Sequence, residues 1–236
     1  MKRILVSAAV AVLAVGASAQ WFENFDSYNA GDQLHGMNGW EGWDGNPGAG
    51  ALVSDAQSSS APNSVDIVGA SDLVQVHSGM FSGVWLYTTE VYLPTKYSGE
   101  SYFILMNTYT SGGNPKDWSL QMVFDSGDGM IHNLGGSGNV VTETQVAYDL
   151  GVWRTIDVLI DLDNNTHTAR YNGQVVVEGE WYGGAGGQQN IGATDLFANN
   201  ANSVFYDNFN VQQVPEPATI AGLSIGLLAL LRRRRN

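Results

Sequence analysis

Residues 39–48 form a glycine-rich segment in which two tryptophans, Trp40 and Trp43, stand among carboxylate and amide side chains. Flat aromatic faces beside such polar groups suit the CH surfaces and hydroxyl groups of a carbohydrate. We therefore take Trp40 and Trp43 as candidate ligand-binding residues. Because tryptophans in β-sandwiches mostly pack in the core, burial of both rings is the alternative. Three further tryptophans could extend an aromatic platform: Trp85, Trp118 and Trp181.

The sequence gives little support for nucleophilic catalysis or for a transition-metal site. The chain has no cysteine, and its serines lie in polar segments without the Gly-x-Ser-x-Gly elbow of serine hydrolases. The four histidines are too widely spaced to suggest a zinc or iron site: His35, His77, His132 and His167. The glycine-rich run at 182–187 lacks the strand, turn and helix of a phosphate-binding site. The sequence therefore predicts no catalytic residue of these kinds.

The charge of the chain excludes several classes of partner. Residues 20–214 contain 22 acidic side chains against four basic ones, a formal charge of −18. Such a surface repels nucleic acids and anionic lipids, so no nucleic-acid partner is expected. A divalent cation is compatible with it. The four basic residues of this stretch are Lys96, Lys116, Arg154 and Arg170.

The N-terminal residues 1–19 have the three parts of a secretory signal peptide. Two basic residues precede the apolar run 4–15, and Ala17-Ser18-Ala19 supplies the small-x-small pattern that signal peptidase reads. We expect a signal helix here and cleavage between Ala19 and Gln20. The alternative of an uncleaved anchor needs an apolar run of about 20 residues, which this segment lacks.

The C-terminal residues 213–236 combine a proline motif, an uncharged segment at 218–231 and an arginine tail. As a helix, the uncharged segment would rise ~21 Å against a hydrocarbon core of ~30 Å. We therefore expect a transmembrane helix that anchors the chain transiently. The positive-inside rule places the arginines in the cytoplasm. The motif residues are Val214, Pro215, Glu216 and Pro217, and the tail residues are Arg232, Arg233, Arg234 and Arg235.

This arrangement closely resembles the PEP-CTERM sorting signal. The resemblance implies an exosortase as partner, a membrane enzyme that cuts near Pro-Glu-Pro and releases the body to the cell surface or the extracellular polysaccharide. It also implies a Gram-negative-type bacterium. A plain C-terminal anchor with a chance pair of prolines is the alternative. The signal accompanies many unrelated bodies, so it does not define an activity.

The body between residues 20 and 212 is predicted to be a single all-β domain. Short β-branched and aromatic runs recur between Gly, Asn, Asp and Ser clusters, and no long stretch has helical spacing. This succession of short strands and turns is typical of an antiparallel sandwich, jelly roll or barrel. The expected strands are 21–25, 51–53, 65–68, 73–76, 84–93, 102–109, 118–124, 130–133, 140–148, 152–161, 166–172, 174–181 and 204–211.

Residues 152–178 make the prediction of the fold more specific. Apolar residues alternate from Ile156 to Leu162, a turn follows, and Asn172-Gly173 supplies a tight hairpin turn before the next strand. This stretch looks like the corresponding part of concanavalin A-like (laminin G, lectin and glucanase) jelly rolls. The opening residues 22–28 and the closing residues 205–211 look like the first and last strands of such domains.

The concanavalin A-like resemblance implies two kinds of site. The glucanases of this group carry a Glu-x-Asp-x-(x)-Glu strand motif, which this chain lacks. A catalytic carboxylate pair assembled from different strands is the alternative. Members of the group often hold a structural calcium ion between their terminal strands. That position maps to Glu23 and Asp207, whose oxygens are the ligands calcium prefers. An apo domain is the alternative.

Together these observations predict an exported surface or matrix protein with a non-catalytic body that binds polysaccharide or contributes to adhesion. The alternative is a secreted polysaccharide-degrading hydrolase or lyase on the same fold. A body without any small ligand is a third possibility. No cofactor other than structural calcium is expected.

Overall fold

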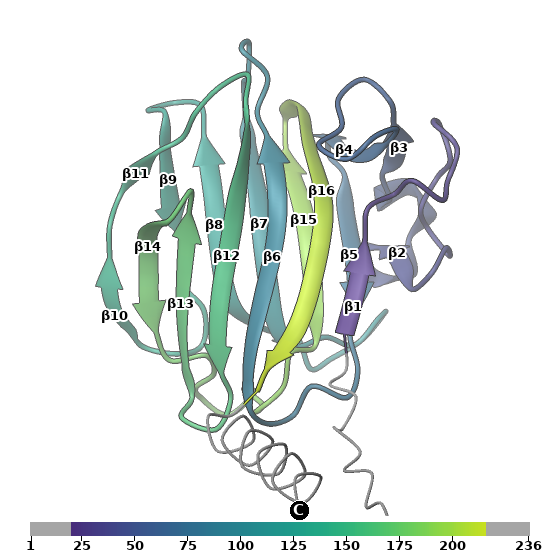
Figure 1. Cartoon of the computed structure of the whole chain (residues 1–236). Helices are drawn as coiled ribbons and strands as arrows, with labels where there is room; N and C mark the ends of the chain where they lie inside the picture. The colour runs from purple at the N-terminus through teal and green to yellow at the C-terminus, as the bar shows by residue number, and fades with distance from the viewer. Residues whose placement is uncertain (1–19, 216–236) are drawn as a thin grey trace, which may run out of the picture.

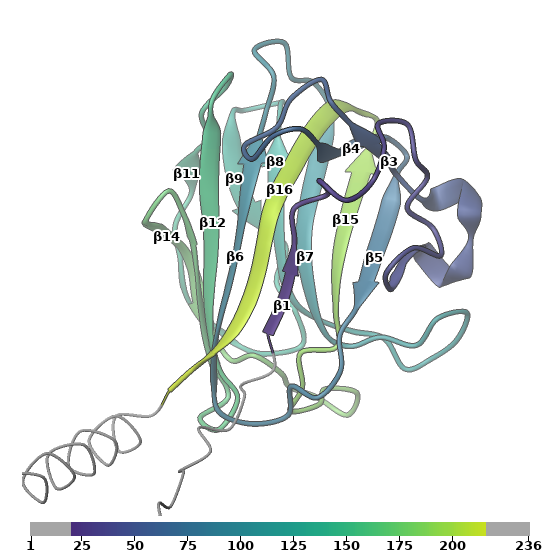
Figure 2. The same cartoon turned by 45° about the vertical axis from the view of Figure 1, so that its right-hand side comes forward.

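The computed structural model describes residues 20–215, which form two antiparallel sheets packed face to face (Figures 1 and 2). The larger sheet contains, in spatial order, β10 (Val140–Glu143), β14 (Gln174–Gly179), β13 (Thr166–Tyr171), β12 (Trp153–Asp161), β6 (Val84–Tyr92), β16 (Ala201–Val214), β4 (Ser64–Gly69) and β3 (Leu52–Ser54), with β1 (Gln20–Glu23) paired to β16. The smaller sheet contains β11 (Val146–Ala147), β9 (Met130–Asn133), β8 (Asp117–Asp125), β7 (Glu100–Thr108), β15 (Ala193–Asn199), β5 (Asp72–Val76) and β2 (Trp40–Gly42). Two short 3₁₀ turns follow β2: η1 (Trp43–Gly45) and η2 (Pro47–Ala49).

Strict alternation along the central strands builds the core between the sheets. On β6 every second residue is buried, and on β12 the buried positions are Ile156, Val158 and Ile160. Because successive side chains of a strand point to opposite faces, this pattern fixes which face meets the other sheet. The hairpin between β13 and β14 turns through Asn172 and Gly173, with φ of 48° and 78°, as a type I′ turn requires.

Aromatic rings fill the core beneath β1 and β16. Phe209 is fully buried at the centre of this group, and its ring centroid lies 5.8–6.4 Å from those of its neighbours. Such tilted and edge-to-face pairs add to the free energy gained by burying apolar area. The neighbouring rings are Trp21, Phe25, Trp40 and Tyr87.

The prediction of an all-β antiparallel sandwich is confirmed. The predicted signal helix at 1–19 and transmembrane helix at 218–231 lie outside the described residues. Within residues 20–215, no helix has the length and apolar character needed to cross a bilayer.

Apart from shifts of up to three residues at the strand ends, the strand predictions differ from the structure at three places. The run 140–148 divides into β10 and β11, which belong to different sheets. β2 and β15 were not predicted, because β2 is short and glycine-rich and β15 contains polar residues among its apolar ones. β15 nevertheless lies in the middle of the smaller sheet, between β7 and β5.

Candidate functional site

The outer face of the smaller sheet carries an apolar cluster that is separate from the core. On β15, Leu196 and Ala198 face the core, whereas Ala193 and Phe197 belong to the outer cluster. An apolar outer face that remains partly open is a common feature of binding sites. Its buried members are Val74, Ile104, Met106 and Ala193, and the aromatic side chains packed on them are Trp43, Tyr102, Tyr109, Trp118 and Phe197.

A β-bulge on β8 brings Trp118 and Gln121 to this same outer face. In the pairing with β7, Leu105 lies opposite Leu120, and Met106 lies opposite Trp118, so Ser119 is the extra residue. Residues three apart on a regular strand would point to opposite faces. Because of the extra residue, Trp118 and Gln121 both point outward. Bulges often redirect side chains in this way beside functional sites.

The turn η1 holds Trp43 over the cluster from the other side. Its ring stacks on that of Trp118, with centroids 6.1 Å apart and planes inclined by 22°. Asp44 has a positive φ of 58°, its N–H donates to the Tyr109 hydroxyl at 3.0 Å, and its Oδ1 accepts from the Gly112 N–H at 3.1 Å. These bonds tie the turn to the end of β7 and fix the aromatic wall.

Two carboxyl groups from neighbouring strands form the floor. Asp195 on β15 lies opposite Val74 of β5, and Asp72 of β5 lies opposite Phe197, so the two aspartates are diagonal neighbours on one face. They are hydrogen-bonded to each other. Asp195 is 3% exposed, and each aspartate keeps a buried Oδ1 without a hydrogen-bond partner.

The electrostatics of this pair assign a proton to Asp195. Burial, the negative charge of Asp72 and the hydrogen bond to Asp72 raise the pKa of Asp195 well above its ordinary value. Burial raises the pKa of Asp72, the hydrogen bond from Asp195 lowers it, and the charge of Asp44 raises it further. Because two close carboxylates do not both ionise easily, Asp72 ionises first and Asp195 keeps its proton to a higher pH.

These elements line an open cleft of about 230 Å³. This is below the roughly 300–1,000 Å³ typical of pockets for drug-sized ligands, so the cleft suits one small ring or group rather than a long chain. Its lining combines aromatic rings with a few convergent polar groups. The lining residues are Trp43, Asp72, Tyr102, Ile104, Trp118, Gln121, Asp195 and Phe197.

The spacing of the two carboxyl groups favours binding over hydrolysis. Retaining glycosidases hold their carboxyl groups ~5–5.5 Å apart, and inverting enzymes ~6.5–9.5 Å apart, so that the scissile bond fits between them. Asp72 and Asp195 are in direct hydrogen-bond contact. They therefore present one joint polar surface to a ligand.

The structure separates the two tryptophans that the sequence grouped together. Trp43 lines the cleft, as the hypothesis of a sugar platform requires. Trp40 is 1% exposed and packs against Trp21, Phe25 and Phe209, so its ring offers no face to a ligand. Of the other tryptophans considered, Trp118 lines the cleft, whereas Trp85 and Trp181 are buried in the core.

Asp72 and Asp195 form a pair that the sequence patterns do not indicate. They are 123 positions apart in the chain, and β15, which carries Asp195, was not predicted. One signal was present: an aspartate in a run whose other members are mostly apolar, Ala193–Asn199, since a charged side chain inside a strand needs a partner or a function.

Glu23 and Asp207 do not have the surroundings of a calcium site. The carboxylate of Glu23 accepts hydrogen bonds from the Phe25 N–H at 2.8 Å and the Tyr28 hydroxyl at 2.7 Å. That of Asp207 accepts from the N–H groups of Ser59 and Ser60, both at 2.8 Å. Hydrogen-bond donors thus occupy the positions from which a cation would approach, so this pair does not fit calcium.

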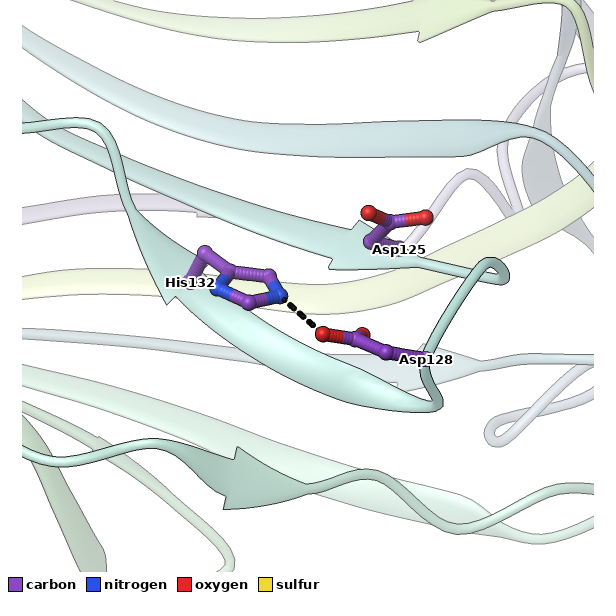
Figure 3. A group of neighbouring side chains, drawn as sticks. All are labelled: Asp125, Asp128 and His132. Atoms are coloured by element: carbon purple, nitrogen blue, oxygen red, sulfur yellow. Dashed lines mark hydrogen bonds and ion pairs between the residues drawn. The ribbon is translucent and has the colours of Figure 1, made fainter.

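A different cluster gathers at the β8–β9 turn, where Asp125, Asp128 and His132 offer ligand atoms within 4.8 Å of one another (Figure 3). His132 Nε2 lies 2.9 Å from Asp128 Oδ2. Asp125 and Asp128 also accept hydrogen bonds from the N–H groups of Gly127 and Met130. The cluster is therefore accounted for as a turn stabilised by local hydrogen bonds, one of them between His132 and Asp128.

Residues 213–235, which begin with the last two residues of β16, match the family described as the PEP-CTERM protein-sorting motif. The chain carries a PEP-CTERM sorting signal. This signal indicates an exported protein that an exosortase handles on its way to the cell surface. Pro215 is the last described residue, and the rest of the predicted motif lies outside the described part: Glu216, Pro217, Arg232, Arg233, Arg234 and Arg235.

The body of this PEP-CTERM protein has the fold of several solved structures. The globular domain of T. cruzi calreticulin matches with a TM-score of 0.55 at 8% identity, over 83% of this chain and 88% of that one. The endo-β-1,4-glucuronan lyase of the fungus Trichoderma reesei matches at 0.51 and 10%, over 82% and 95%. Trypanosoma rangeli sialidase matches at 0.51 and 13%, over 82% of this chain but 30% of the sialidase.

At these identities the similarity establishes the fold alone. No curated protein matches the sequence.

Proposed function

We propose that this PEP-CTERM protein is a carbohydrate-binding component of the cell surface or extracellular polysaccharide matrix, and that its β-sandwich binds sugar without cleaving it. One observation carries the proposal: an aromatic cleft on the outer face of a sheet, with a carboxyl pair at its floor. Aromatic faces stack on the CH surface of a sugar, and the carboxyl oxygens accept from its hydroxyl groups. The contact between the carboxyl groups supports binding over catalysis.

The replacement Trp118→Ala is expected to weaken glycan binding at least tenfold, a loss of about 1.4 kcal/mol. Trp118 supplies one of the two stacked rings of the cleft wall, so its removal takes away half of the platform. A glycan array identifies the ligand, and titration calorimetry measures the affinity of both proteins. The full-length chain is held in a detergent without a sugar headgroup, because a glycosidic headgroup would compete.

The matched control is Trp153→Ala. Trp153 is also half-buried, but it lies on β12 of the larger sheet, where it packs against Tyr92. The control is expected to bind like the wild type. Equal losses in both variants would count against the cleft, and release of sugar ends or unsaturated products from any bound glycan would replace the binding role by the polysaccharide-degrading alternative.

For sorting, we infer that signal peptidase removes residues 1–19 before Gln20, and that residues 218–231 hold the chain in the inner membrane until an exosortase acts. In that system Pro215, Glu216 and Pro217 form the recognition element, and the arginine tail keeps the C-terminus in the cytoplasm. The body then reaches the surface or matrix of a Gram-negative-type cell.

The replacement of Pro215, Glu216 and Pro217 together by alanine is expected to leave most of the protein in the membrane fraction. The apolar segment and the arginines remain, so insertion persists while recognition is lost. Fractionation and immunoblotting of the native host measure the released fraction. Glu180→Ala, a change in the body, is the control. Undiminished release of the triple variant would contradict the assignment of these residues.

A further inference from the structure

The floor of the cleft carries a negative charge that its lining does not neutralise. None of the eight side chains that line the cleft in the described part of the chain is basic. The buried Oδ1 atoms of Asp72 and Asp195 have no hydrogen-bond partner. A buried charge and an unpartnered buried acceptor both cost free energy unless a ligand or a neighbour compensates them. A positively charged ligand would do so.

The wall of the cleft has the chemistry that attracts a cation. Aromatic faces bind ammonium groups through the negative potential above the ring, within about 6 Å of its centroid. The protein already uses this attraction once: Lys116 Nζ lies 5.2 Å from the Trp43 ring centroid and 5.7 Å from that of Tyr109. Lys116 is held there by an ion pair with Asp44. Neither of these two residues lines the cleft.

We propose that the cleft binds an amino sugar, a hexose ring that carries a free and protonated amine. This inference rests on the proposed carbohydrate-binding function. The ring packs against Trp43 and Trp118, and the ammonium group lies against the half-buried carboxyl group of Asp72, where it compensates the charge of the pair. An ammonium group has three donors and no acceptor, which suits a floor made of acceptors. A cleft of about 230 Å³ suits a single such ring.

Other sugars fit this floor less well. The carboxylate of a uronic acid would meet the charge of Asp72 at short range and be repelled. A neutral hexose or an N-acetylated amino sugar would cover that charge without compensating it, which costs free energy in a low-dielectric site. The formal charge of −18 between residues 20 and 214 also favours the approach of a cationic glycan.

The test is calorimetric titration of the full-length chain at pH 5.5 with three β-1,4-linked hexamers: glucosamine, N-acetylglucosamine and glucose. We expect the glucosamine hexamer to bind at least tenfold more tightly than either of the others. Equal or tighter binding of an uncharged hexamer would overturn the inference but leave the proposed function intact. Failure of all three, and of every glycan on an array, would overturn both. Equal binding of spermidine would also overturn the inference, since it has amines but no sugar ring.

Two variants that lose the same amount of negative charge distinguish binding in the cleft from non-specific attraction of a cationic glycan to an acidic protein. The first carries Asp72→Asn and Asp195→Asn, and the second carries Asp55→Asn and Glu143→Gln, which are exposed residues on or next to the larger sheet. The preference for glucosamine is expected to disappear in the first and persist in the second. If both variants lose it equally, the inference fails. A melting curve checks folding, and the single variant Asp72→Asn decides the matter if the double variant is unfolded.

Discussion

The replacement Trp40→Ala is expected to lower the free energy of unfolding by about 3–5 kcal/mol, the usual loss for a large aromatic side chain removed from a core. The Trp40 ring is 1% exposed and contacts the rings of Trp21, Phe25 and Phe209. Its deletion leaves a cavity among rings that are fixed by several strands and cannot close it. Urea denaturation followed by circular dichroism measures the change.

Two companion variants make this prediction specific. Trp40→Phe keeps most of the apolar volume and removes the indole N–H, which is buried without a partner, so a smaller loss is expected. Trp43→Ala is expected to lose less stability than Trp40→Ala, because Trp43 is only half-buried, but to weaken glycan binding. A Trp40→Ala protein that unfolds like the wild type and fails to bind sugar would reverse the assigned roles.

Local geometry explains why the sequence could not separate these tryptophans. Trp40 opens β2, where Trp40 and Gly42 face the core and Glu41 faces outward. The strand ends at once in η1, and Trp43, three residues after Trp40, meets the outer cluster on the opposite face of the sheet. A glycine-rich segment permits many such turns, so composition alone indicated an aromatic loop but not which ring it buries.

The parts of the fold that were predicted correctly depend on short-range patterns. The alternation from Ile156 to Leu162 and the Asn172-Gly173 turn specify β12, β13 and β14 within a continuous stretch of chain. The PEP-CTERM signal was recognisable for the same reason, since all its parts are adjacent in sequence. Local patterns of this kind need no knowledge of distant strands.

The floor of the cleft depends instead on long-range pairing. Asp195 becomes a site residue because β15 lies between β7 and β5, opposite Ile104 on one side and Val74 on the other. Nothing near Asp195 in the sequence specifies these neighbours. The bulge at Ser119, which turns Trp118 outward, is likewise visible only in the pairing of β8 with β7. The sandwich could therefore be predicted, whereas the joint position of Trp43, Trp118 and the carboxyl pair could not.

The replacement Asp195→Asn is expected to stabilise the protein at pH 7.5, by about 1.4 kcal/mol for each unit by which the folded state raises the pKa of Asp195. Asn has nearly the same shape and its amide can donate to Asp72, so the hydrogen bond is kept while the second titrating carboxyl group is removed. For a domain of this size, 1 kcal/mol corresponds to roughly 2–4 °C in Tm. Thermal and urea unfolding of both proteins measure the gain.

The pH dependence of this gain follows from the direction of the pKa shift. Burial and Asp72 raise the pKa of Asp195 in the folded state, so the folded wild type holds a proton that the unfolded chain releases above pH ~4. The wild type therefore loses stability as the pH rises from ~4 through the raised pKa. The variant has no such group, and its advantage should be near zero at pH 4 and grow toward pH 7.5.

Buried groups outside the carboxyl pair also titrate in this window, but their contributions cancel in the comparison of the two proteins. Burial raises the pKa of Asp207 to about 6, which acts in the same direction as Asp195. Burial lowers the pKa of His77 and His167 from the ordinary 6.5 to about 4 in the folded state. Both histidines therefore act in the direction opposite to Asp195, because the protein loses stability as the pH falls from ~6.5 toward 4. All three groups are present in both proteins and lie away from the cleft lining.

The control Asp66→Asn separates the effect of the carboxyl pair from that of burial alone. Asp66 on β4 also has a pKa raised by burial and an unpartnered Oδ1, but its hydrogen-bond donor is Ser203 rather than a second carboxyl group. A smaller gain is expected there. A gain at Asp195 that does not change with pH would disprove the shared proton. If Asp195→Asn is more stable and also binds glycan less tightly, the carboxyl pair is a strained arrangement whose stability cost is retained for ligand binding.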